Sequence, residues 1–276
     1  MDLKALIADR FGVDLGLSNS QALTPFLERV LARRTHRSYT DARVPPELVD
    51  LLLAVAFSAS SKSDFQQASV IELSDAGKRS RIAAHFPAMP WIGTSPVFLV
   101  FCADPRRLER ICSIRSHPQP NADLEAFLNA SVDAALVMQT FILAAESVGL
   151  GCCPISVIRN QMETVARELA LPDGVFPVAG LCVGYPAGGG QVSMRLPPTI
   201  TIHSDTYDER GLEEKIADYD RRRHARHAIP RDQQRNPSRF GHAEFYGWSE
   251  DKARQAAQPE GASFAAYIKS HGFSFG

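Results

Sequence analysis

The chain has 276 residues, 45% of them hydrophobic, and a formal net charge of −1, which is typical of a folded globular protein. A charge this close to zero argues against a polyanion-binding role, so we expect no nucleic-acid partner. No apolar run reaches the roughly 18–20 residues of a membrane span, and the apolar start at residues 3–7 is too short for a signal peptide. We therefore predict a cytoplasmic protein with no membrane partner.

The five cysteines are an odd number, and three of them lie within apolar runs. This pattern favours buried, reduced thiols over a disulfide framework, and we interpret the adjacent pair Cys152 and Cys153 as packing residues. The sequence contains no Cys-x-x-Cys or His-x-x-x-His spacing, so we predict no metal site.

An arginine-rich stretch, Arg-Arg-Thr-His-Arg-Ser-Tyr at residues 33–39, follows a predicted helix. That helix has a start signal at Thr24 and Pro25 and apolar residues at helical spacing between 26 and 31. The arginines therefore lie where the helix gives way to an extended segment. Guanidinium groups are suited to binding phosphate, although a solvated charge cluster at a helix end is the alternative interpretation.

The remainder of the chain alternates between helical and strand patterns. We expect a helix from Pro46, a small polar loop at 58–64, strands at 68–73, 96–102 and 177–186, and helices from Asp75, at 129–149, at 159–169 and at 263–270. The helix at 129–149 is apolar on nearly every face, which is typical of a core or subunit-interface helix. We predict an α+β fold around a single sheet, with a core at 1–203 and a C-terminal extension at 204–276.

Four segments together resemble the nitroreductase family of flavin mononucleotide (FMN) enzymes. They are residues 33–39, residues 59–61 with Gln66, residues 133–151, and residues 180–186 with the Arg-Leu-Pro at 195–197. The chain looks most similar to the oxygen-insensitive NADPH nitroreductase and flavin reductase branch. This resemblance implies a three-layer α-β-α fold with a central mixed sheet, a long buried helix at a dimer interface, and an extension that wraps the partner subunit.

The resemblance also implies a set of FMN-binding residues. A flavin site needs cations at its phosphate end and further donors along the edge of its ring. Arg33, Arg34, Thr35 and Arg195 are expected at the phosphate and ribityl end, and Arg37 at the pyrimidine edge. Ser60 and Ser61 are expected from the partner subunit, with Gln66 close by in the same loop. Backbone N–H groups of a loop formed by Pro154, Ile155, Ser156 and Val157 are expected near N5 and O4 of the ring.

The sequence departs from the family pattern at three places. Ser193 replaces a lysine that precedes the conserved arginine in close relatives, so Arg37 is expected to carry more of the charge. The segment Met89-Pro90-Trp91 replaces a polar segment that reaches the flavin, and the loop at 154–157 lacks the usual glycines. A basic run at 221–227 either binds the 2′-phosphate of NADPH or forms a solvated helix face with salt bridges.

The implied function is a homodimeric oxidoreductase that uses NADPH or NADH. In a ping-pong mechanism, hydride passes to N5 of FMN and then to a nitroaromatic, quinone, azo or flavin acceptor. The cofactor carries the chemistry, so no catalytic side chain is expected. The alternatives are a specialised flavin-dependent reductase or oxidase of one metabolite, and a non-catalytic flavin-binding module.

Overall fold

The sheet at the centre of the fold has four strands in the order β1-β2-β4-β3. They span Ala68–Glu72 (β1), Val97–Ala103 (β2), Gly151–Ile155 (β3) and Phe176–Gly184 (β4). The inner strand β2 is buried along its whole length, as its run of β-branched and aromatic residues predicts. Every pairing among the described strands is antiparallel, whereas we expected a mixed sheet.

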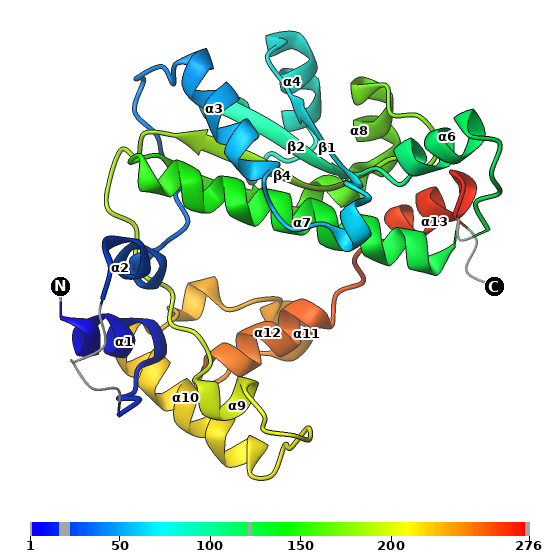
Figure 1. Ribbon diagram of the computed structural model, residues 1–276. Helices are drawn as coiled ribbons and strands as arrows, with labels where there is room; N and C mark the ends of the chain where they lie inside the picture. The colour runs from blue at the N-terminus through cyan, green and yellow to red at the C-terminus, as the bar shows by residue number, and fades with distance from the viewer. Residues whose placement is uncertain (1, 17–22, 121–122, 274–276) are drawn as a thin grey trace. The chain divides into compact units, whose positions relative to one another are not determined.

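The side chains of β2 alternate between two hydrophobic cores on opposite faces of the sheet. Leu99 and Phe101 pack in the core covered by α3 (Pro46–Ala56) and α7 (Leu124–Ser147). Phe98 and Val100 pack in the other core, with α4 (Ala76–Ala83), α5 (Trp91–Thr94) and α8 (Met162–Leu169). Figure 1 shows α7 running along the sheet. This helix–sheet–helix arrangement confirms the predicted three-layer α+β class.

Helix α7 is the long apolar helix expected from the sequence, and it begins five residues earlier than predicted. Among the described residues it alone is long and apolar enough to cross a membrane by length and composition. Its buried residues Ala134, Phe141 and Ala145 pack in the core beneath the sheet, and Asp133 is also buried on this helix. These contacts identify α7 as a core helix.

The structure, a computed structural model, describes residues 2–16, 23–120 and 123–273. The chain divides into two compact units, the first formed by residues 1–33 and 192–260 and the second by residues 34–191 and 261–276. The sheet and its covering helices belong to the second unit, which also contains η1 (Lys62–Asp64), α6 (Arg106–Ile114), η2 (Ser156–Gln161) and α13 (Ala262–Ser270).

The first unit is helical in its described part. It contains α1 (Leu3–Phe11), α2 (Pro25–Ala32), α9 (Pro198–Thr201), α10 (Leu212–Arg226), η3 (Arg231–Gln233), α11 (Pro237–Phe240) and α12 (Trp248–Ala256). The side chain of Thr24 caps α2, as its helix-start signal predicts. The chain continues from α2 in extended conformation at Arg33, which confirms the predicted helix end.

The basic run at 221–227 lies on α10, and three of its arginines bind backbone carbonyls within the first unit. Arg222 donates to the carbonyl oxygens of Phe11 and Gly12, and Arg226 donates to those of Ala8 and Asp9. These carbonyls belong to the C-terminal end of α1, where a cation complements the helix dipole. Arg223 donates to the carbonyl oxygen of Met194. The structure therefore gives these arginines a role in packing.

Candidate functional site

The segment after Arg33 runs in extended conformation along one end of the sheet. The backbone N–H of His36 donates to the carbonyl oxygen of Cys152 over 3.0 Å, and that of Thr40 donates to the carbonyl oxygen of Tyr185 over 2.8 Å. Gly151 permits this close approach, because a Cβ there would lie 2.8 Å from the His36 ring. The backbone contacts therefore fix the predicted residues Arg34, Thr35 and Arg37 beside β3 and the end of β4.

The side chain of Arg34 is tied to the glycine-rich loop that follows β4. Its Nη1 donates to the carbonyl oxygen of Gly190 over 2.7 Å. A Cβ on Gly190 would lie 3.3 Å from the carbonyl oxygen of Thr35, so the two segments are in tight contact. The guanidinium carries five N–H donors, and this hydrogen bond fixes its position while using only one of them.

Tyr39 holds the arginine segment against the sheet. Its hydroxyl oxygen lies 2.7 Å from the carbonyl oxygen of His36 and 3.1 Å from that of Cys182. Burial raises the pKa of the Tyr39 phenol well above its usual range, the nearby thiols of Cys182 and Cys153 add to that rise, and Arg37 opposes it. The phenol is therefore a neutral hydrogen-bond donor at physiological pH.

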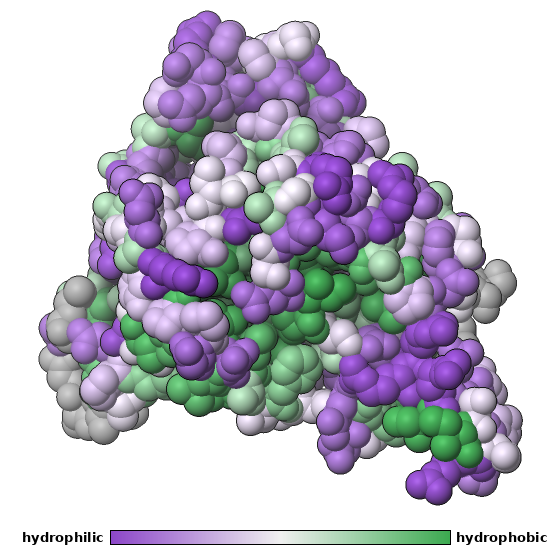
Figure 2. All heavy atoms as spheres, turned by 90° about the horizontal axis from the view of Figure 1, so that it is seen from above, coloured by the Kyte–Doolittle hydropathy of each residue, from purple (hydrophilic) through white to green (hydrophobic). Residues whose placement is uncertain are grey.

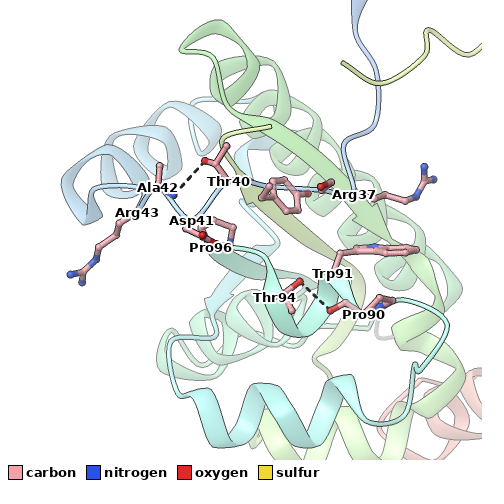
Figure 3. Close-up of a pocket in the computed structure, with 11 residues that line it drawn as sticks. Arg37, Thr40, Asp41, Ala42, Arg43, Pro90, Trp91, Thr94 and Pro96 are labelled. Carbon is pink, nitrogen blue, oxygen red and sulfur yellow. Dashed lines mark hydrogen bonds between the residues drawn. The ribbon is translucent and has the colours of Figure 1, made fainter. Parts of the chain in front are cut away.

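Arg37 and Trp91 line a pocket of about 480 Å³ at the edge of the second unit. Figure 3 shows the guanidinium groups of Arg37 and Arg43 directed to opposite sides, with the indole of Trp91 beneath Arg37. Burial raises the pKa of the Cys153 thiol, and the positive charge of Arg37 partly offsets this. The segment that departs from the family pattern, Met89-Pro90-Trp91, thus contacts the predicted ring-edge arginine. The pocket is lined by Arg37, Ser38, Tyr39, Thr40, Asp41, Ala42, Arg43, Pro90, Trp91, Thr94 and Pro96.

Ser60, Ser61 and Gln66 lie together on the segment between α3 and β1. They line a second pocket of about 310 Å³ together with Asp133 of α7. The Ser61 hydroxyl donates to a carboxylate oxygen of Asp133 over 3.0 Å and accepts from the backbone N–H of Gln66 over 2.7 Å. No role for Asp133 is predicted from the sequence, although an aspartate inside an apolar helix is an available signal.

Arg33 and Arg195, the other two predicted phosphate ligands, belong to the first unit, where a buried arginine connects them. Arg10 is 6% exposed and its side chain donates to the carbonyl oxygens of Arg33 and Ser193. The backbone N–H of Arg195 donates to the carbonyl oxygen of Arg10 over 2.7 Å. Arg10 was missed by the sequence analysis, although it follows Leu6 and Ile7 at helical spacing and so shares their buried face.

The segment Pro154 to Val157 is not the loop that we expected. Pro154 and Ile155 end strand β3, and Ser156 and Val157 begin the 3₁₀ turn η2. Ile155 is paired with Gly180 in the sheet, and Pro154 has no backbone N–H to donate. Ser156 and Val157 are therefore the residues of this segment that can offer N–H groups to a ligand.

Within one chain, the Ser61 group contacts the middle of α7, whereas the arginine segment pairs with β3, which follows the end of that helix. Asp133, which holds Ser61, is fourteen residues before Ser147, where the helix ends just ahead of β3. At 1.5 Å per residue, Asp133 lies about 21 Å from the end of the helix along its axis. The described residues contain no group of three His, Cys, Asp or Glu side chains that could hold a metal ion.

Comparisons with sequence models and with known proteins all match members of one family. The sequence model of the nitroreductase family matches residues 30–185, and that of the nitroreductase family C-terminal domain matches residues 193–276. An FMN reductase (NAD(P)H) of Bacillus subtilis is 36% identical over 192 residues, which cover 68% of this chain and 76% of that protein. An oxygen-insensitive NADPH nitroreductase of Salmonella typhimurium is 35% identical over 206 residues, covering 71% of this chain and 83% of that protein.

The structure of B. megaterium NfrA2 superimposes with a TM-score of 0.82 at 29% identity, covering 92% of this chain and all of that one. The fold and the match over more than half of the sequence define the class: the chain belongs to the nitroreductase family. The resemblance inferred from the four sequence segments is thereby confirmed.

The residues of the second unit fit the flavin that this family implies. Arg34 and Arg37 would offer cations from one extended segment, and a Cβ on Gly190 would lie 3.3 Å from the carbonyl oxygen of Thr35 and 3.5 Å from the Arg34 side chain. The hydroxyl and amide groups of Ser60, Ser61 and Gln66 line one pocket, where they would offer polar partners to a bound flavin.

Proposed function

We propose that this protein transfers hydride from NADPH or NADH through FMN to a nitroaromatic, quinone, azo or flavin acceptor, in alternating half-reactions. FMN, when bound, supplies the redox chemistry, and the side chains of the protein bind and orient the cofactor. The observation that carries the proposal is the arginine segment, fixed at the end of the sheet by the backbone of His36 and the side chain of Arg34.

The enzyme class and its cofactors follow from family membership. The protein is an NAD(P)H-dependent flavin oxidoreductase of the nitroreductase family, and its cofactors are FMN and NAD(P)H. Beyond this class, we propose the alternating mechanism, the acceptors and the roles of individual residues.

We assign each predicted site residue the role in flavin binding that its side-chain or backbone chemistry supports. Arg34 and Thr35 bind the phosphate and ribityl end, together with Arg33 and Arg195. Arg37 lies at the pyrimidine edge, where its charge stabilises negative charge that develops on the ring. Backbone N–H groups of Ser156 and Val157 serve the N5 side of the ring, with Pro154 and Ile155 packing beside them.

We further propose that the protein is a cytoplasmic homodimer with FMN bound at the interface. Asp133, which binds Ser61, lies about 21 Å along α7 from the helix end that precedes β3, and Arg37 lies beside β3, so this separation favours a flavin shared between two chains. A second copy whose α7 runs antiparallel brings the Ser61 group of one chain to the Arg37 group of the other.

The surface of α7 supports this assembly. Four large apolar side chains spaced four residues apart are exposed along it, and such a stripe marks an interaction surface. They are Leu124, Leu128, Val132 and Leu136. Figure 2 shows that apolar side chains on the viewed face are grouped rather than scattered among hydrophilic ones.

Flavin titration followed by anaerobic reduction tests the function. We expect FMN fluorescence to be quenched when the purified protein binds FMN, and NADPH or NADH to bleach the visible absorbance of the bound flavin. Binding without bleaching by either nucleotide would identify a non-catalytic flavin-binding module. Bleaching that a single metabolite alone can reverse would identify a specialised reductase, and no binding at all would exclude a flavin enzyme.

A further inference from the structure

The loop that carries Ser61 and Gln66 has an unusual backbone. Ser63, Asp64 and Gln66 all have positive φ, at 49°, 58° and 54°, although none of them is a glycine. Each residue in this left-handed region is disfavoured by contact between its Cβ and its own backbone. Three such residues within four positions persist only where surrounding groups impose the conformation.

The carboxylate of Asp133 is one of these groups. It is 1% exposed, and it accepts hydrogen bonds from the Ser61 hydroxyl, the backbone N–H of Lys62 and the backbone N–H of Gln67 at 2.9–3.0 Å. The carboxylate therefore binds donors at the start and at the end of the strained segment. Hydrogen bonds to an ionised acceptor are about twice as strong as neutral ones.

The guanidinium of Arg107 on α6 holds the same loop by its carbonyl groups. It donates to the carbonyl oxygens of Gln66 and Ala68, and it is fixed by a 2.9 Å ion pair with Asp104. The backbone N–H of Asp104 also donates to the carbonyl oxygen of Gln67. The Asp133 carboxylate thus accepts from backbone donors of the loop, and the Arg107 guanidinium donates to the carbonyl oxygen of Gln66 at the end of the loop.

We propose that Asp133 and Arg107 are positioning residues for flavin binding, which act by imposing the left-handed conformation on residues 61–67. This inference rests on the proposed function, in which Ser60, Ser61 and Gln66 contact the flavin of the partner subunit. A loop that served only to connect α3 to β1 would have no need of three left-handed residues. Here the conformation brings Ser60, Ser61 and Gln66 to one pocket, whose wall includes Asp133 itself.

The test compares FMN binding by Asp133→Asn and Arg107→Met with that of the wild-type protein. In Asp133→Asn, the backbone N–H of either Lys62 or Gln67 faces the amide NH₂ group, which cannot accept a hydrogen bond. One end of the loop is then no longer held by this side chain. We expect the FMN dissociation constant to rise about tenfold or more in Asp133→Asn and about threefold or more in Arg107→Met, since Arg107 is partly exposed. The visible circular dichroism of the bound flavin should change in both variants, and Arg107→Lys should restore part of the affinity.

Asp123→Asn is the matched control. It also replaces an aspartate by asparagine on α7, but Asp123 caps the start of the helix and its side chain binds the backbone of Glu125, not the loop. Hydrogen exchange of the FMN-free protein measures the mechanism directly. The amides of Lys62 and Gln67 should exchange slowly in the wild type and in Asp123→Asn, and faster in Asp133→Asn.

Several results would overturn the inference. If a variant binds FMN with a dissociation constant within twofold of wild type, the replaced residue has no positioning role. The same conclusion holds if binding weakens but amide exchange in the loop is unchanged. If Asp133→Asn does not fold, fast exchange of Lys62 and Gln67 in the wild type excludes the role of Asp133, and slow exchange together with weaker binding by Arg107→Met supports it. A wild-type protein that does not bind FMN overturns the proposed function, whereas failure in the variants alone overturns only this inference.

Discussion

The guanidinium carbon of Arg37 lies 5.7 Å from the centre of the Trp91 ring. A cation above an indole face is held by the ring quadrupole, with about 0.5–1 kcal/mol at an exposed site. The indole therefore orients the arginine that the proposed function places at the flavin edge.

Replacing Arg37 with alanine should weaken FMN binding and slow flavin reduction by NADPH. A hydrogen bond to a charged group contributes about 1.5–3 kcal/mol, so we expect about a tenfold change or more in the dissociation constant. Fluorescence titration and anaerobic stopped-flow absorbance measure the two effects. Arg43→Ala is the control, because Arg43 lines the same pocket and extends to the opposite side. Unchanged values of both quantities in Arg37→Ala would refute the role.

The raised pKa of Tyr39 predicts a loss of stability in alkaline solution. Because the folded-state pKa lies above that of the unfolded chain, the folded state keeps a proton that the unfolded state releases above about pH 10. The contribution is complete below that pH and declines above it by up to about 1.4 kcal/mol per pH unit. Tyr39→Phe should be less stable than wild type at pH 7 and should lose less stability between pH 9 and 11.

Denaturant unfolding across that pH range measures the difference. Tyr207→Phe, which removes a hydroxyl from a side chain that is 75% exposed, should keep the wild-type pH dependence. Parallel curves for wild type and Tyr39→Phe would show that the phenol is not held neutral by the fold.

The basic run on α10 should act on stability rather than on nucleotide choice. Arg222→Ala removes hydrogen bonds to the last carbonyls of α1 and a 2.8 Å ion pair with Asp218. A cation at a helix C-terminus contributes about 0.3–1 kcal/mol, so we expect the melting temperature to fall by about 1–4 °C. The KM for NADPH should stay unchanged. Arg221→Ala, at an exposed position with a longer 3.5 Å contact, should have little effect on stability. A raised KM for NADPH in Arg222→Ala would instead assign the run to the nucleotide.

The exposed apolar stripe of α7 should be required for dimer formation. Leu128 is 54% exposed, so Leu128→Glu places a charge on the surface without disturbing the core. We expect sedimentation to show a shift from dimer to monomer, and FMN affinity to fall with it, because each flavin site needs both chains. Ile114→Glu changes an equally apolar exposed residue on α6 and should leave the dimer intact. A dimeric Leu128→Glu protein with normal FMN affinity would place the interface elsewhere.

Much of the fold is readable from the sequence because its signals are local. Thr24 caps α2, Asp75 caps α4, and the apolar runs of β2 and α7 are long enough to be unambiguous. Strand β3 was missed because its five residues include a glycine and a proline, which are usually absent from strands. It is formed by pairing with β4, a contact that local sequence does not encode.

In the candidate site, too, local features are visible in the sequence, whereas contacts between distant segments are not. The arginine segment is a candidate site from the sequence because three cations fall within five residues, and its role in flavin binding stays a prediction. The buried roles of Arg10 and Asp133 depend on carbonyl and amide groups brought together from distant parts of the chain. The left-handed backbone at Ser63, Asp64 and Gln66 has no sequence signal at all, because glycine is the usual marker of that conformation.

The length of α7 has a genetic consequence. If each flavin site takes Arg37 from one chain and Ser61 from the other, chains carrying Arg37→Ala and chains carrying Ser61→Ala are defective in different halves of the site. A mixed dimer of the two contains one site with both substitutions and one site with neither. Co-expressing the two inactive proteins should therefore restore up to about half of the wild-type activity per mixed dimer, a complementation that a site built within one chain cannot show.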